Sequence, residues 1–496
     1  MREIRTSSSM SGARKRNHGK DKGTGRMAKA AGNSYFPLPT ATAPGADSTL
    51  QTGMIHLLKG ISENIGLAEV LQEAFPSTYE RIFALASFLV CCGEPVSHCA
   101  DWMERSDIGE VGPMSSQRIS ELLHSVSVQE RELFFSRWNR YMSDLDYLAL
   151  EITSISSWSQ HIDDVEWGYN RNGDKLPQIN LCMLVGQQSY LPVRMMVYSG
   201  SIRDVSTLET TVSQLAPGCR DKVLIVMDKG FASRKNINMM LRKEGLLFLI
   251  ALPFTLRFAK KQLEAERKDI DSVQNTIVSG SDILRGVSKK RAWGDGHKLF
   301  VHVFYNDMNA VAVKNNLYGR VRQLIEAAEN DPNNSKLKPY FDRYLIIRSS
   351  SKNKRGYTIN LREDVVAQEL AHAGWLVTLS NHIQDAAQAI TVYRAKDVIE
   401  KGFMRIKSSL GLDRLRVHSQ QAMESKMFIG FIALIMLSHI HRVMLKKDLY
   451  KTMTMKGLMR TMEKQRTQVI DGRRILFPLS KKQKEIYNAF DVSIPV

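Results

Sequence analysis

Cysteine is scarce in this chain, with only five in 496 residues. A disulfide framework is typical of short, cysteine-rich secreted chains, so that class is excluded. Cys91 and Cys92 are adjacent and Cys99 follows His98, but no second pair stands at zinc-ligand spacing. We therefore expect reduced thiols, buried in a helical segment, and no zinc site.

Long apolar runs are also lacking. The longest, Met427 to Ser438, is about a dozen residues, which is too short to span a bilayer of about 30 Å. The N-terminus is basic and rich in Ser, Gly and Asn, without the apolar core of a secretory signal. These absences predict a soluble, intracellular protein that does not bind a membrane.

Acidic residues are outnumbered, since 69 Lys and Arg stand against 51 Asp and Glu, for a formal net charge of +18. Between Arg442 and Lys484, thirteen basic residues face only Asp448, Glu463 and Asp471. The first thirty residues form a second basic block. An excess of this size predicts a polyanionic partner, and a nucleic acid is the natural candidate.

The order of hydrophobic patterns predicts an α/β fold. Residues 1–50 have the composition of a disordered segment, and 51–142 show the apolar spacing of helices. Residues 143–252 predict three strands that can pair as a meander, followed by helix, strand, helix and strand. That is the order of a ribonuclease-H-like core. The expected strands are Tyr147–Thr153, Leu176–Gly186, Tyr190–Tyr198, Lys222–Met227 and Leu246–Leu252.

This pattern breaks at residues 253–373, which we interpret as an inserted subdomain containing strands at Lys298–Tyr305 and Tyr340–Arg348. Residues 374–412 predict a last core strand and a helix, and 413–496 predict a basic helical C-terminal tail. The expected fold is thus a ribonuclease-H-like core, interrupted by a β-containing subdomain, with a helical N-terminal domain and a basic helical tail.

A helix-like stretch places Tyr393, Lys396, Glu400 and Lys407 at offsets of three, four and seven residues. At about 3.6 residues per turn these side chains share one stripe. One carboxylate beside two ammonium groups and a phenol suits a divalent metal next to a nucleic-acid backbone. A solvated helix face with favourable charge pairs is the alternative interpretation.

Three carboxylates fall where a ribonuclease-H-like topology would bring them together. Glu151 lies on the first strand, Asp228 ends the fourth, and Glu400 is on the last helix. Such a set can hold two metal ions for phosphoryl transfer. For Asp228 the alternative role is a helix N-cap. Asp204, after the third strand, is a candidate auxiliary acid.

These residues resemble the signature Tyr-x2-Arg-x3-Glu-x6-Lys of a group of DDE-type insertion-sequence transposases. Tyr393, Glu400 and Lys407 match it, whereas Lys396 stands where the signature has Arg, which keeps the charge but loses the bidentate fork. The resemblance covers roughly three quarters of the chain, from about Ser115 onward. It also rests on Ile152–Ser157, Gly168–Gly173, Leu176–Leu181, Gly200–Val205 and Asp228–Phe231.

The resemblance implies Mg²⁺- or Mn²⁺-dependent cleavage at transposon ends and strand transfer into target DNA. It implies that Glu151, Asp228 and Glu400 are the catalytic metal ligands and that Tyr393, Lys396 and Lys407 bind DNA phosphates. The expected partners are double-stranded DNA, both end repeats and target, and a second copy of the chain in a synaptic dimer. The expected location is the nucleoid of a prokaryotic cytoplasm.

Glu151 departs from the family pattern, which has Asp at this position. The extra methylene lengthens the side chain by roughly 1.5 Å, whereas catalytic groups tolerate about 0.5 Å of misplacement. Either the strand has shifted to accommodate Glu, or the protein is a DNA-binding relic that cannot cut. A third interpretation is a metal-dependent nuclease of another kind, which would cut without strand transfer. In the inserted segment, Trp293 is a candidate for stacking on a flipped base, against the alternative of a core tryptophan.

Overall fold

A large mixed sheet organises the structure, a computed structural model that describes residues 47–141, 147–215, 223–280, 282–350, 356–470 and 473–495. Its nine strands have the order β4-β3-β2-β5-β6-β12-β9-β8-β7. The first five are β2 (Tyr147–Ser156), β3 (Gln178–Gly186), β4 (Pro192–Ser199), β5 (Val223–Met227) and β6 (Leu246–Ala251).

The pairing follows the predicted order of strands. β2, β3 and β4 are antiparallel neighbours, while β5 runs parallel to β2 and β6 runs parallel to β5. Every residue of β5 is buried, as expected for a central parallel strand that is covered on both faces. The apolar runs recognised in the sequence therefore form the middle of the sheet.

Part of the segment 253–373 extends this same sheet. β7 (Thr276–Ser279), β8 (Asp282–Gly294) and β9 (His297–Tyr305) join it through β12 (Trp375–Ser380), which lies between β6 and β9. The predicted strand at Lys298–Tyr305 is confirmed as β9. The rest of the segment is mostly helical.

The prediction of a strand over Tyr340–Arg348 is wrong in its first half. Residues up to Tyr344 belong to α11 (Lys338–Tyr344), which has a proline in its first turn, where the fixed backbone angle of proline favours a helix start. β10 (Leu345–Ser349) follows and pairs with β11 (Tyr357–Leu361).

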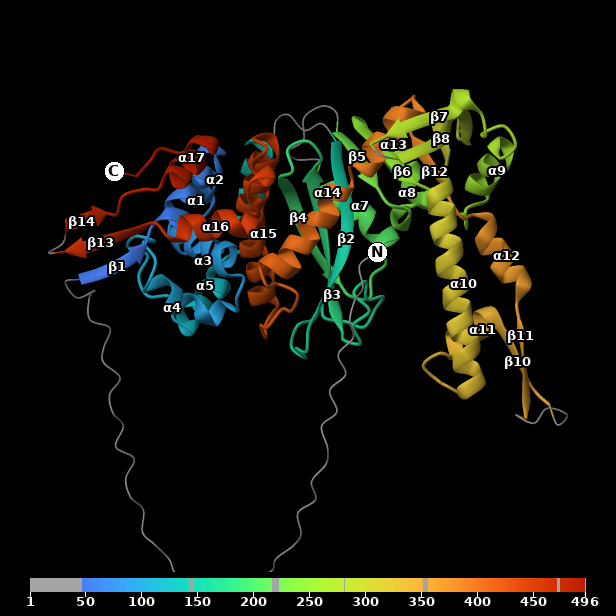
Figure 1. The fold of residues 1–496 in the computed structure, drawn as a ribbon, viewed down its shortest axis with the longest axis horizontal. Helices are drawn as coiled ribbons and strands as arrows, with labels where there is room; N and C mark the ends of the chain where they lie inside the picture. The colour runs from blue at the N-terminus through green and yellow to red at the C-terminus, as the bar shows by residue number, and fades with distance from the viewer. Residues whose placement is uncertain are drawn as a thin grey trace, which may run out of the picture. The chain divides into compact units, whose positions relative to one another are not determined.

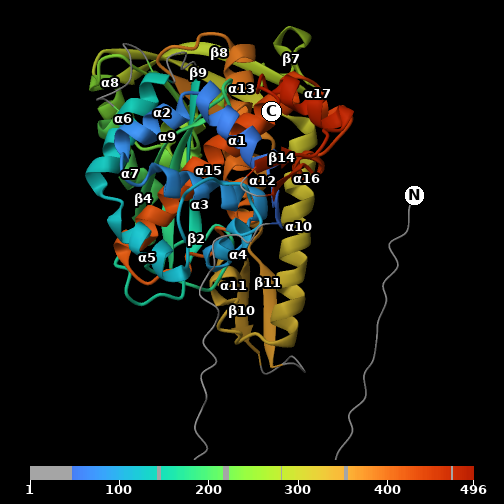
Figure 2. The ribbon, with the colours of Figure 1, turned by 90° about the vertical axis from the view of Figure 1, so that its left-hand side faces the viewer.

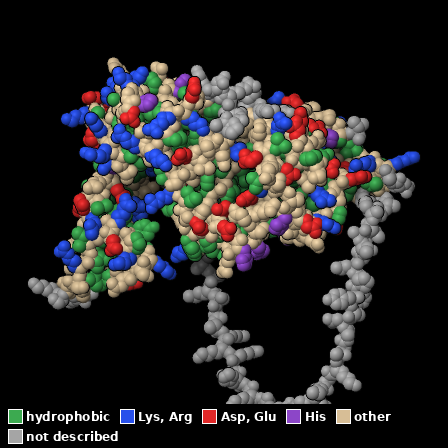
Figure 3. Space-filling model, turned by 180° about the vertical axis from the view of Figure 1, so that it is seen from behind, with side chains coloured by type: hydrophobic (Ala, Val, Ile, Leu, Met, Phe, Trp, Pro, Cys, Tyr) green, Lys and Arg blue, Asp and Glu red, His purple; other side chains and the backbone are tan. Residues whose placement is uncertain are grey.

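These elements, with α10 (Asp307–Asn330) and α12 (Glu363–Ala371), share a separate small hydrophobic core. Figures 1 and 2 show them projecting from the sheet. Lys and Arg side chains gather over this part of the surface in Figure 3.

Helices lie around the sheet in Figure 1. Among them, α14 packs against β2 and β3, and α13 packs against β5. The helices around the sheet are α7 (Asp204–Leu215), α8 (Arg234–Arg242), α9 (Arg257–Glu266), α13 (Ala386–Arg394), α14 (Asp397–Met404) and α15 (Gln420–Lys446).

The N-terminal region is helical, as predicted. Its helices are α1 (Gly53–Asn64), α2 (Leu67–Ala74), α3 (Tyr79–Cys92), α4 (Cys99–Met103), α5 (Ser116–Ser125) and α6 (Val128–Tyr141). Cys99 is buried, but Cys92, at the end of α3, is exposed, so the expectation of buried thiols is wrong for Cys92.

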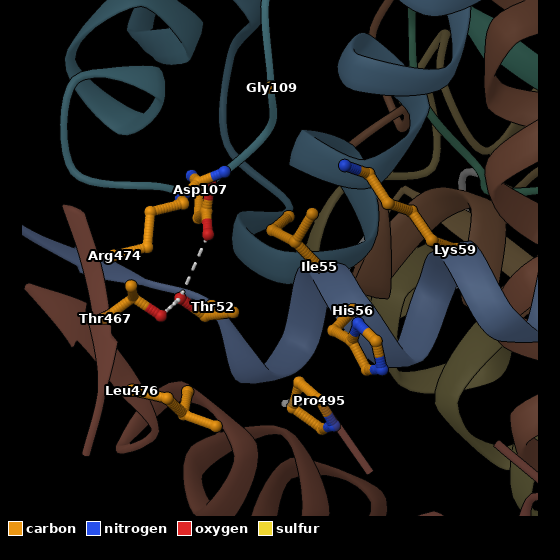
Figure 4. Close-up of a pocket in the computed structure, with 10 residues that line it drawn as sticks. All are labelled: Thr52, Ile55, His56, Lys59, Asp107, Gly109, Thr467, Arg474, Leu476 and Pro495. Atoms are coloured by element: carbon orange, nitrogen blue, oxygen red, sulfur yellow. Dashed lines mark hydrogen bonds and ion pairs between the residues drawn. The ribbon is translucent and has the colours of Figure 1, made fainter. Parts of the chain in front are cut away.

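The predicted disordered segment 1–50 is wrong at its end, and residues 1–46 lie outside the described part of the chain. β1 (Asp47–Gln51) pairs with β13 (Arg466–Ile470), which pairs with β14 (Arg473–Leu476). Figure 4 shows how Thr52 reinforces this pairing, because its hydroxyl donates to Thr467 Oγ1 at 2.7 Å.

The C-terminal tail is therefore only partly helical, with α16 (Met455–Glu463) before the hairpin and α17 (Lys481–Ala489) after it. The β-branched residues Thr467, Val469 and Ile470 are followed in the sequence by Asp-Gly, a strong hairpin signal that the prediction overlooked.

α15 joins the helical region to the sheet, since it packs against α3, α5 and β4. By length and composition it could cross a membrane, but 78% of its apolar window is buried inside the protein. Phe428 at its centre is fully buried and lies 5.4 Å from the ring of Phe75 and 5.1 Å from that of Phe134. This burial is typical of a core helix.

Phe428→Ala should therefore lower the free energy of unfolding by about 3–5 kcal/mol, because it leaves a cavity among packed rings. Urea denaturation followed by circular dichroism measures the change. Leu445→Ala, at an exposed position of the same helix, is the matched control and should have a much smaller effect. Equal losses in both variants would contradict the assignment of α15 as a core helix.

Candidate active site

Strand register brings the first two predicted carboxylates together. Leu150 of β2 pairs with Met227 of β5, so Glu151 and Asp228 are the next residues on two adjacent parallel strands. Glu400 comes from α14, which packs on β2 and β3. Three elements that are distant in the sequence thus contribute one acid each, as the topology predicted.

Lys396 connects two of these acids. Its Nζ lies 3.1 Å from Glu151 Oε2 and 3.4 Å from Glu400 Oε1, and the residue is only 6% exposed. Burying an ammonium group is costly unless carboxylates compensate its charge. Burial lowers the pKa of Lys396 and the surrounding carboxylates raise it, and the net shift of the pKa is upward. Lys396 is therefore a protonated counterion inside the cluster.

For Glu151, burial and the ion pair with Lys396 act on the pKa in the reverse directions. Burial raises the pKa of its carboxyl group, Lys396 lowers it, and the negative charges of Glu400 and Asp228 raise it again. The net shift of the pKa is upward, as expected where several carboxylates converge in a partly buried space. Such crowding favours the binding of positive charge.

Asp228 does not act as a helix cap. It precedes the short 3₁₀ helix Lys229–Phe231, and its side chain makes no capping hydrogen bond. Instead Oδ1 accepts a hydrogen bond of 3.0 Å from the Tyr393 hydroxyl. Burial, together with the charge of Asp228, raises the pKa of Tyr393, so the phenol remains a neutral donor.

The predicted helical stripe is not one helix. α13 ends at Arg394, α14 begins at Asp397, and Lys407 lies in a π-helical turn, Arg405–Ser409. Such wide turns are rare and frequently occur at functional sites. Tyr393, Lys396 and Glu400 still converge on the carboxylate cluster, but Lys407 lies with a different set of partners.

Lys407 contacts the polar end of β2 and the following loop. Its Nζ donates to Thr153 Oγ1 at 2.6 Å and to Asn172 Oδ1 at 2.8 Å. Burial, together with the nearby charge of Arg171, lowers the pKa of this ammonium group to about 8. No carboxylate contacts Lys407 directly in the described part of the chain.

The loop Gly168–Gly173 supports the site, and the sequence analysis assigned it no role. Arg171 forms an ion pair with Asp204 and lies 3.4 Å from Asn180 Oδ1. Asn172 binds Lys407 and donates to the Ser154 carbonyl at 3.2 Å. The cluster of amide and guanidinium side chains between two glycines was the signal that could have revealed this function.

Asp204 lies beside the turn that carries Asp228. A Cβ at Gly230 would lie 2.8 Å from Asp204 Oδ2, so only glycine allows this approach. The Asp204 carboxylate is already paired with Arg171. Its role as an auxiliary acid stays a prediction, and the structure places it as the partner that anchors Arg171.

Trp293 is placed in the core rather than at a DNA-facing surface. It is 7% exposed, and its indole N–H donates to Asn238 Oδ1 at 2.7 Å. Its ring lies 4.9 Å from that of Phe258, edge to face. The alternative of a core tryptophan therefore describes its position, and the indole face is not free to stack on a base.

The cluster offers carboxylate oxygens, the ligands that hard divalent cations prefer. In this structure the ammonium group of Lys396 supplies the positive charge among them. Across the described ranges, however, no three His, Cys, Asp or Glu side chains lie close enough together to hold one metal ion. The ammonium of Lys396 occupies the space between Glu151 and Glu400.

The lowered pKa of Lys407 predicts a pH dependence of stability. Between about pH 8 and the ordinary lysine pKa of 10.5, the unfolded chain holds a proton that the folded protein has released. Stability relative to the non-titrating variant Lys407→Met should therefore rise across this interval. Urea unfolding at several pH values tests this, with Lys235→Met as the control for removing one lysine. A difference that stays constant or falls would contradict it.

Comparison with known proteins identifies the family of the region that contains this site. The family model described as "Transposase DDE domain" matches residues 149–436, which include Glu151, Asp228 and Glu400. No curated protein sequence matches the chain. A solved structure, titled "Cryo-EM structure of piggyBac transposase synaptic complex with hairpin DNA (SNHP)", is similar with a TM-score of 0.40 and 12% identity, covering 83% of this chain and 76% of that one. Since the matched residues make up more than half of the sequence, the chain belongs to the transposase DDE domain family.

Proposed function

We propose that this protein is an insertion-sequence transposase that cleaves DNA at transposon ends and transfers the freed 3′-hydroxyl to target DNA. The observation that carries the proposal is the convergence of Glu151, Asp228 and Glu400 with Lys396 and Tyr393, where β5 ends beside the middle of β2. Family membership supports DNA cleavage and strand transfer as the class of reaction.

Strand order supports a ribonuclease-H-like interpretation of the core. β4-β3-β2-β5-β6 comprises a three-stranded antiparallel meander followed by two parallel strands. In this arrangement the first and fourth core strands, β2 and β5, are neighbours, which is what brings Glu151 next to Asp228. The third acid then comes from α14, which packs against β2 and β3.

Once Lys396 has left the space between Glu151 and Glu400, the acids Glu151, Asp228 and Glu400 would be the residues that hold Mg²⁺ or Mn²⁺, hard cations that prefer oxygen ligands. When bound, such ions activate the attacking oxygen and stabilise the leaving oxygen of a phosphoryl transfer. Lys396 pairs with two of these carboxylates in the free protein. We propose that its ammonium group turns to a DNA phosphate when metal ions and DNA are bound.

The other side chains have roles that follow from their protonation. Tyr393 stays a neutral phenol at physiological pH, so it can donate to Asp228 or to a phosphate oxygen. Lys407 is held by two neutral oxygens, so a phosphate that approached it would stabilise its charged form without breaking an ion pair.

A cationic stripe on α16 offers a second contact with the DNA backbone. Lys456 and Arg460, with Lys464 just after the helix, are spaced by four residues and therefore share one face. All three are exposed, and none forms an ion pair within the described ranges. We propose that this stripe binds phosphates of the end repeat or the target.

Cleavage and joining of two ends implies a synaptic dimer, and we propose this assembly, acting at the nucleoid of a prokaryotic cytoplasm.

No finding supports the alternative of a catalytically impaired relic. Glu151 lies in the same cluster as the other two acids, and its carboxylate reaches Lys396.

Asp228→Asn and Glu400→Gln should each abolish metal-dependent cleavage, since each removes a charged oxygen ligand while keeping the size of the side chain. Cleavage of a labelled duplex carrying the element's own end measures activity, and gel shift measures binding, which should stay within a few-fold. Glu209→Gln, an exposed acid on α7, is the control and should cut normally. Undiminished cutting by either site variant would overturn the active-site assignment.

Replacing Lys456 and Arg460 together by alanine should weaken duplex binding and make it less sensitive to salt. Each lost phosphate contact reduces the slope of log K against log salt by about 0.9. The matched control is Lys235→Ala with Lys481→Ala, two exposed lysines that face Glu209 and Glu485. If both double variants keep the wild-type slope, α16 does not contact DNA.

A further inference from the structure

Two adjoining cavities near the C-terminal end of β2 share Arg416, Val417 and His418, and both are lined entirely by neutral or basic residues. One, of about 280 Å³, is completed by Ser157, Trp158, Ser159, Gln160 and His161. The other, of about 320 Å³, is completed by side chains that include those of α5. We call the first cavity the Trp158 groove.

Trp158 is the main apolar surface of this groove. It is 67% exposed, and its indole N–H has no hydrogen-bond partner among the described residues. The Arg414 guanidinium lies 5.5 Å from the ring centroid. Proteins that bind single-stranded nucleic acid stack its bases on exposed aromatic rings of this kind, with contributions from arginine.

The polar side chains of the groove are donors without acidic partners. Arg416 is exposed, is held at a positive φ of 50°, and forms no ion pair in the described parts of the chain. His161 and His418 are also exposed. Asp163 and Asp413 are close in the sequence but line neither cavity. The groove therefore suits an anionic occupant.

The groove is connected to the active site through β2. Ser156, the last residue of this strand, forms a parallel bridge with Arg414. Ser156 is five positions beyond Glu151, a distance of roughly 17 Å along an extended strand. At the stacked rise of about 3.4 Å per nucleotide, a strand of about five nucleotides is long enough to span this distance.

We propose that the Trp158 groove binds an unpaired DNA strand that leaves the active site, with a base stacked on Trp158 and a phosphate held by Arg416 and His418. This inference rests on the proposed transposase function. The basic N-terminal block of the chain itself is a poor occupant, since its charge has the same sign as that of the groove.

The test compares the affinity of the protein for a blunt duplex with its affinity for the same duplex carrying a single-stranded extension of about five nucleotides. Extensions of both polarities are used, and EDTA prevents cleavage. Fluorescence anisotropy should show tighter binding to one extended duplex. Trp158→Ala should lose about 5- to 150-fold of affinity for that duplex, as expected for one stacked base.

Trp167 provides a matched control, because it is 69% exposed in the same β2–β3 connection but does not line either cavity. Trp167→Ala should bind like the wild type, and Trp158→Phe should retain most of the preference. Arg416→Gln should reduce the salt slope for the extended duplex by about 0.7, the value for one contact with a single strand.

Equal binding of the extended duplex by the wild type and Trp158→Ala would overturn the inference, as would equal losses in Trp158→Ala and Trp167→Ala. Either result leaves the proposed function standing if the wild type still cleaves its end DNA. A wild-type protein that binds neither duplex would instead contradict both the inference and the proposed function.

Discussion

The ion cluster around the buried Lys396 is the interaction on which the site depends. Three carboxylates from β2, β5 and α14 would repel one another at close range, and their mutual repulsion is offset by one ammonium group that contacts Glu151 and Glu400 directly. The Tyr393 hydroxyl satisfies Asp228 in the same way. The sheet supplies the positions of the acids, while these two donors keep the acids together when no other cation is present.

Support for this cluster comes from the loop Gly168–Gly173, which contains no acidic residue and binds Asp204 through Arg171. Arg171 and Asn172 connect the end of β2, the start of α7 and the π-helical turn of Lys407. The turn itself packs beside α15, whose apolar residues fill the junction between the sheet and the N-terminal helices. Catalytic geometry and hydrophobic core are therefore linked through a single stretch of chain, from α13 to α15.

The sequence was sufficient to predict contacts set by strand order. Glu151, Asp228 and Glu400 could be brought together because parallel neighbours place consecutive strand ends side by side. Local backbone geometry was harder to predict, since periodicity alone does not show the break after Arg394 or the wide turn at Lys407. The pairing of β1 with β13 was missed. Residues 47–50 were assigned to the disordered N-terminal segment, because their partner strand lies more than four hundred positions away, as the Thr52–Thr467 separation of 415 shows.

That last pairing has a consequence for synthesis of the protein. The first described strand, β1, can find its partner only after the ribosome has translated β13, more than four hundred residues later. Contacts of such high sequence separation form late, because a long loop must close before they contribute. Any product that terminates early, through a frameshift or a nonsense codon, would leave β1 and the surface of α1 uncovered and open to proteolysis.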